Sequence, residues 1–104
     1  MDGYSLSGQG IDLEGTGSNL GTITSAATSS ATPAISMVGK SDTTGAGADR
    51  GVYVTLGITI SATGGGDVSL TGDNAAIPAT DVGSIYIFGS DILASTGKIT
   101  LNGG

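Results

Sequence analysis

The sequence contains no cysteine and no histidine among its 104 residues. Without cysteine the chain has no disulfide framework, no thiolate zinc site and no cysteine nucleophile. Without histidine it also lacks the commonest general base and metal ligand. These absences narrow the side chains available for catalysis, and we expect no enzyme activity, no metal site and no cofactor.

Basic residues are also scarce. Lys40, Arg50 and Lys98 stand against nine acidic residues, and the net charge is −6. Binding to a phosphate backbone requires clustered lysine and arginine, so we expect no nucleic-acid partner. No uninterrupted apolar run approaches the roughly 20 residues of a membrane-spanning helix, and we expect no membrane insertion.

The chain does contain an internal repeat. A motif of five residues, with an apolar or aromatic residue at its first position, another apolar residue at its third and glycine at its fifth, begins at residues 4, 35, 68 and 99. The steps are 35−4=31, 68−35=33 and 99−68=31 residues. Self-similarity at such a period is typical of solenoids. We therefore interpret residues 1–104 as one β-solenoid segment with repeats 4–34, 35–67 and 68–98 and a partial repeat 99–104.

Two further triplets recur between these motifs in a constant order. The first reads Ile11-Asp12-Leu13, Val52-Tyr53-Val54 and Ile85-Tyr86-Ile87, and the second reads Thr22-Ile23-Thr24, Ile58-Thr59-Ile60 and Asp91-Ile92-Leu93. We align the second set from its first residues, which places its last two members 91−58=33 positions apart. Most triplets alternate apolar and polar residues, which is typical of a strand with one buried face, and no segment shows a helical period.

Three short strands in each repeat, separated by glycine-rich corners, predict an all-β fold. The expected fold is a right-handed parallel β-helix of about three coils, with a longer polar loop once per coil at residues 40–50 and 73–82. The predicted core consists of two sets of ladders. One contains Tyr4, Ile35, Val68 and Ile99 beside Leu6, Met37, Leu70 and Leu101, and the other contains Ile11, Val52 and Ile85 beside Leu13, Val54 and Ile87.

Three aromatic residues are the candidate binding residues. Tyr53 and Tyr86 are 33 positions apart, which predicts that they lie one coil apart on the outer face, next to Phe88 and below Asp12. Exposed aromatic rings on such a face could stack on sugar rings. Alternatively, the rings stack on each other and cover the sheet, as aromatic neighbours on adjacent strands commonly do.

Carboxylates offer little support for catalysis. Asp49 and Asp81 precede Gly51 and Gly83 and could stack on adjacent coils, with Arg50 beside them. Acid–base cleavage of polysaccharides needs a pair of carboxylates in defined roles, whereas an aspartate before a corner commonly caps the turn. Asp67 has no aligned carboxylate in the neighbouring repeats, so we predict neither a calcium site nor catalytic residues.

The strings GVYVTLGITISATGGGDVSLTG (51–72) and GSIYIFGSDILASTGKITLNGG (83–104) resemble repeats of filamentous-haemagglutinin-type exoproteins and related adhesin-like surface proteins. These families are large bacterial proteins exported by two-partner or autotransporter routes. The resemblance implies a long right-handed β-helix that projects from the cell surface. It implies a structural shaft more strongly than any particular ligand.

The sequence therefore predicts an adhesive and structural segment of a large secreted bacterial surface protein, located outside the cell. Its expected partners are cell-surface glycans and, through open β edges, other copies of the chain. We expect the 104 residues to be a piece of a longer protein. The alternative is a subunit that stacks end to end into an extracellular filament, and a polysaccharide-cleaving β-helix enzyme is a distant third.

Overall fold

A computed structural model describes residues 1–5, 9–16, 20–28, 32–41, 50–73 and 84–103 of the chain. These residues form an all-β structure. Its strands are β1 (Asp2–Ser5), β2 (Ile11–Glu14), β3 (Thr22–Ser25), β4 (Ile35–Ser41), β5 (Val52–Thr55), β6 (Thr59–Ala62), β7 (Val68–Asp73), β8 (Ile85–Phe88), β9 (Asp91–Ala94) and β10 (Ile99–Gly103).

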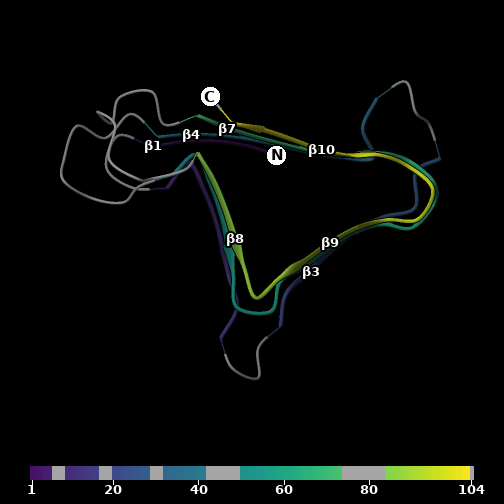
Figure 1. The fold of residues 1–104 in the computed structure, drawn as a ribbon, viewed down its shortest axis with the longest axis horizontal. Helices are drawn as coiled ribbons and strands as arrows, with labels where there is room; N and C mark the ends of the chain where they lie inside the picture. The colour runs from purple at the N-terminus through teal and green to yellow at the C-terminus, as the bar shows by residue number, and fades with distance from the viewer. Residues whose placement is uncertain (6–8, 17–19, 29–31, 42–49, 74–83, 104) are drawn as a thin grey trace.

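The strands form three parallel sheets. The first has the order β1-β4-β7-β10, the second β2-β5-β8 and the third β3-β6-β9. Successive strands therefore enter the three sheets in turn, and Figure 1 shows the sheets as the three sides of a triangle. We call one passage of the chain through the three sheets a coil. The prediction of an all-β, solenoid-like arrangement with about three coils of three short strands is confirmed at this level.

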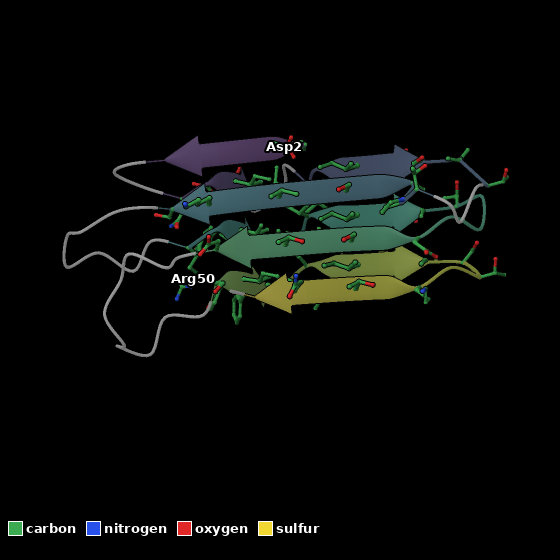
Figure 2. The ribbon with its side chains drawn as sticks, turned by 90° about the horizontal axis from the view of Figure 1, so that it is seen from above. Asp2 and Arg50 are labelled. Carbon is green, nitrogen blue, oxygen red and sulfur yellow. The ribbon has the colours of Figure 1, made fainter. Side chains whose placement is uncertain are left out.

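Figure 2 shows the strands of the first sheet side by side, from β1 at the upper edge to β10 at the lower edge. We call the edge formed by β1, β2 and β3 the upper edge of the molecule. The edge formed by β8, β9 and β10 is the lower edge.

The core lies inside the triangle and is built from alternate residues of β2 to β9. Val52 and Val54 on β5 and Val68 and Leu70 on β7 are completely buried. The predicted ladders of the second sheet are confirmed, because Ile11, Val52 and Ile85 are in register and so are Leu13, Val54 and Ile87. β-Branched side chains fit this position because their stiff Cβ packs on like neighbours about 4.8 Å away.

The first sheet confirms one part of its predicted ladders and contradicts another. Ile35 is in register with Val68 and Ile99, and Met37 with Leu70 and Leu101. Tyr4, however, lies opposite Lys40 and not opposite Ile35. The observed step between β1 and β4 is 38−2=36 residues, five more than predicted. Leu6, the other predicted residue of this repeat, lies outside the described residues.

A glycine ladder explains this register. Gly3 lies opposite Gly39, which lies opposite Gly72 and then Gly103. At the first three of these positions an added Cβ would overlap a carbonyl oxygen at the start of the second sheet. Because only glycine fits there, Gly3 determines the register of β1, and an odd shift of five residues exchanges the two faces of the strand.

The third sheet is displaced by one residue from the predicted alignment. Thr22 lies opposite Thr59, which lies opposite Asp91, so the offset between the last two strands is 91−59=32 and not 33. This register aligns Ile23, Ile60 and Ile92, and Ile60 is completely buried. A one-residue slip would turn Thr59 into the core, and the cost of burying its hydroxyl selects the observed pairing.

The strands also extend into the predicted loops. β4 includes Lys40 and Ser41, and β7 includes Asp73, with Lys40 directly opposite Asp73. Arg50, the last residue of the first predicted loop, is described and precedes β5, whereas residues 42–49 and 74–82 lie outside the described residues.

The corner after β5 contains a strained residue. Leu56 adopts φ +62°, followed by Gly57 at φ +86°. A side chain in the left-handed region costs roughly 1–2 kcal/mol, and Leu56 is exposed, so little packing offsets this cost. We expect Leu56→Gly to raise the free energy of unfolding by up to about 1 kcal/mol in a urea titration, since the added flexibility of the unfolded chain cancels part of the gain. A lower unfolding free energy would instead mean that the contact of this side chain with its surroundings is stabilising.

Candidate binding surface

The aromatic ladder, Tyr53, Tyr86 and Phe88, lies on the outer face of the second sheet. Tyr53 on β5 is in register with Tyr86 on β8, and Phe88 follows Tyr86 by two residues on the same strand. All three alternate with inward residues such as Val52 and Val54, so their side chains leave the opposite face of the sheet. The structure confirms the predicted placement, including the position of Asp12 next to Tyr53 on β2.

The rings of the ladder stack on one another. The centroids of Tyr53 and Tyr86 are 5.3 Å apart with an interplanar angle of 11°, and those of Tyr86 and Phe88 are 6.4 Å apart at 22°. The in-register pairing of β5 and β8 brings the two tyrosines to this distance. Tyr53 and Tyr86 therefore stack on each other and cover the sheet, as the second of the two interpretations predicts.

The two rings on β8, at the lower edge, are more exposed than the ring on β5. Tyr53 is half-buried, Tyr86 is 36% exposed and Phe88 is 59% exposed. Phe88 lies beside a single ring of the ladder, and most of its apolar surface faces solvent. The sugar-stacking interpretation therefore depends mainly on Tyr86 and Phe88.

Arg50 belongs to this surface, which the sequence analysis did not predict. Its guanidinium carbon lies 4.3 Å from the centroid of Tyr86 and 5.7 Å from that of Tyr53. Both distances fall within the range of cation–π attraction. In the sequence, Arg50 stands out only beside Asp49 and Asp81, which lie outside the described residues. The sequence carried no signal for this contact, because Arg50 lies two residues before β5 and an odd offset of three residues from Tyr53 would predict opposite faces of a strand.

Backbone contacts fix the position of Arg50. Its N–H donates to the side-chain oxygen of Gln9 at 2.5 Å, and its carbonyl oxygen accepts from the N–H of Gly10 at 3.0 Å. Both partners belong to the preceding coil. Figure 2 shows Arg50 at the end of the first sheet toward which β4 and β7 point, where the chain turns toward the second sheet. The guanidinium group is thus attached to an anchored backbone and contacts the aromatic ladder from there.

Asp67 has a structural contact rather than a place in a carboxylate cluster. One of its carboxylate oxygens accepts the backbone N–H of Lys98, one coil below, at 2.8 Å. The contact joins the corners that precede β7 and β10. Within the described residues there is no group of three or more acidic side chains placed to hold a metal ion.

The lower edge contains a hollow of about 500 Å³ beside β9. Its lining is mostly apolar and consists of Ser61, Ala62, Thr63, Ile92, Leu93, Ala94, Ser95 and Ile99. Ala62 and Ile92 belong to the core face of the third sheet, so the hollow opens onto the end of the core.

The described part of the chain contains no helix that could span a membrane.

Comparison with protein families, with curated proteins and with solved structures found no match for this chain.

Proposed function

We propose that this chain is a segment of the shaft of a large secreted bacterial surface protein of the adhesin type. The shaft is a right-handed parallel β-helix, and the segment acts outside the cell, at the bacterial surface, without catalysis. The resemblance of residues 51–72 and 83–104 to filamentous-haemagglutinin-type repeats supports this proposal.

The observation that carries the proposal is the regular register from coil to coil. The second sheet pairs β2, β5 and β8 residue by residue, and the first sheet pairs β4, β7 and β10 in the same way. Each coil therefore repeats the cross-section of the previous one, and adding coils lengthens the molecule without changing its core. This is the geometry that an extended stalk requires.

The aromatic ladder is the proposed contact surface for glycans. Sugar rings present apolar C–H groups that pack on aromatic faces, and Phe88 and Tyr86 provide exposed rings of this kind. Arg50, at 4.3 Å from the Tyr86 centroid, adds hydrogen-bond donors beside the rings. The outer face of a shaft is also the surface that another cell would meet.

We expect Tyr86→Ala and Phe88→Ala to weaken glycan binding at least tenfold, measured on a glycan array and then by calorimetry with the best ligand. Each loses an exposed ring, and the unfolding free energy should fall by no more than roughly 1.5 kcal/mol, the size of one aromatic pair. Val38→Ala is the matched control, because Val38 is an exposed apolar residue on β4 in a different sheet. Equal binding by all three variants would contradict a glycan site at the ladder, and so would a loss of binding no larger than the unfolded fraction of each variant explains.

The second candidate function is a subunit that stacks end to end into an extracellular filament. The specific observation in its favour is the exposure of core positions at the lower edge. Ile99 and Leu101 are 45% and 54% exposed, whereas Val68 and Leu70, which precede them in the same ladders, are completely buried. An apolar end of this kind is stabilised when another coil covers it.

A further inference from the structure

The lower edge of the molecule is an unusually unprotected β edge. β8 and β10 contain no charged residue and no proline, and β9 contains one charged residue, Asp91, although these are the residues by which natural sheets commonly prevent edge pairing. The exposed large apolar side chains of these strands and of β9 are Tyr86, Phe88, Leu93, Ile99 and Leu101. The hollow beside β9 lies at the same edge.

We propose that this lower edge binds the upper edge of a second copy of the chain, with each sheet continuing in the register found inside the molecule. The inference rests on the filament function above and specifies its joint. In the second sheet, β2 of the second copy lies beneath β8. It pairs with β8 in the same way as β8 pairs with β5 and β5 pairs with β2 within the chain. Ile11 and Leu13 of the second copy then continue the ladders that end at Ile85 and Ile87.

The third sheet provides a residue for the hollow. β3 of the second copy takes the position beneath β9, which places its Ile23 under Ile92, as Ile60 lies beside Ile92 within the chain. The hollow, with Ile92, Ala94 and Ile99 in its lining, is apolar and opens at this edge. Covering Ile92 with Ile23 therefore removes apolar surface from water, which is the main driving force for such an association.

The first sheet contributes less. β1 begins at Asp2, which pairs with Val38, and that position corresponds to Asn102 on β10. Met1 of the second copy therefore lies beneath Leu101, and Ile99 extends beyond β1. Because the main pairing comes from the second and third sheets, these two sheets determine the register of the joint.

Charge favours the same partner. Residues 1–34 contain Asp2, Asp12 and Glu14 and no basic residue, so the upper coil is purely acidic. The guanidinium group of Arg50 lies 4.3 Å from the centroid of Tyr86, the ring directly above the place that Asp12 of the second copy takes. A carboxylate approaching an arginine supports the head-to-tail orientation over the pairing of two lower edges.

The joint is heterologous, because the upper edge of one copy meets the lower edge of the next. Such an interface leaves both outer ends open, and repetition gives a filament rather than a closed dimer. The expected product is a rod whose length grows with protein concentration.

A cysteine pair tests the register directly, because the natural chain contains no cysteine. The double variant Glu14→Cys with Phe88→Cys places the two thiols opposite each other across the joint. Within one molecule they cannot pair, since β5 lies between β2 and β8 and separates them by two strand spacings, roughly 9.6 Å. Mild oxidation should give a ladder of covalent oligomers on a non-reducing gel. Glu14→Cys with Tyr86→Cys is the matched control, because it keeps Asp12 and two residues out of register exceed the reach of a disulfide.

Association is measured independently by sedimentation velocity over a concentration series. Leu101→Lys should weaken it at least tenfold, whereas Val38→Lys, the same change at an exposed position on the outer face, should leave it unchanged. A monomer at all concentrations overturns both the filament function and this joint. Association with equal crosslinking of the two cysteine pairs overturns the joint alone.

Discussion

Val54→Asp is expected to unfold the protein at room temperature. Val54 is completely buried on β5, in register with Leu13 on one side and Ile87 on the other. A carboxylate there would have no cationic partner in the described core, whose buried members are apolar apart from Ser41 and Thr55. An uncompensated buried charge costs about 3–5 kcal/mol, which is comparable to the whole stability of a small domain.

The measurement is a urea titration followed by far-ultraviolet circular dichroism. Val38→Asp is the control, because it makes the same change at a strand position that is 42% exposed on the outer face. Its expected cost is below about 1 kcal/mol, although Asp2 lies opposite on β1 and adds some repulsion. Similar unfolding curves for the two variants would mean that the inward and outward faces have been assigned wrongly.

Gly39→Ala is expected to have an effect of similar size for a different reason. A Cβ at this position would overlap the carbonyl oxygen of Gly51 and approach Cγ2 of Val52 to 3.0 Å. The carbonyl oxygen of Gly51 is a backbone atom, and it also accepts the N–H of Ile11 at 2.8 Å. Widening the corner between the first and second sheets would strain this bond, so we expect a loss of about 3 kcal/mol, the upper end of the usual cost of overpacking.

Gly103→Ala provides a matched control on the same glycine ladder. Gly103 occupies the position of Gly39 two strands further along the first sheet, yet among the described residues an added Cβ would meet only the side chain of Ser84, at 3.7 Å. We expect this variant to be unchanged or more stable by up to about 1 kcal/mol, because alanine loses less backbone entropy on folding than glycine. Thermal unfolding by calorimetry checks both variants. An equal loss of stability in Gly39→Ala and Gly103→Ala would show that the glycine ladder depends on the backbone freedom of glycine and not on the absence of a side chain.

The regular part of the fold was predictable because its signal is local. Apolar alternation at Val52 and Val54, repeated 33 residues later at Ile85 and Ile87, is sufficient to predict strands with one inward face. The same spacing predicted the contact between Tyr53 and Tyr86. Successive coils lie one strand spacing apart, so any pair of residues separated by one repeat becomes a pair of neighbours.

The first coil was predicted wrongly because two local signals compete there. The triplet that begins at Tyr4 matches the strand pattern, whereas Gly3 matches the glycine ladder, and the two imply registers that differ by five residues. If the register places an apolar side chain wrongly at an edge strand, the fold loses part of the free energy of burying that side chain. If it places a Cβ against a carbonyl oxygen, the two atoms overlap, and this steric repulsion is larger. The glycine therefore determines the pairing.

Arg50 illustrates what side-chain spacing alone leaves open. In the sequence it stands next to Asp49, and nothing in that neighbourhood indicates that its guanidinium group contacts Tyr86, 36 residues away. The contact arises because β5 and β8 are adjacent and because hydrogen bonds to Gln9 and Gly10 hold the Arg50 backbone at the corner.

The sequence by itself determined that the chain is all-β, that it repeats and which residues of the second sheet face inward, because strand alternation and repeat spacing are properties of the chain in order. The tertiary structure decided the register of the first and third sheets, the place of Arg50 and the apolar character of the lower edge. These features depend on the close approach of atoms from different coils, and such contacts are fixed only when the sheets meet at their corners.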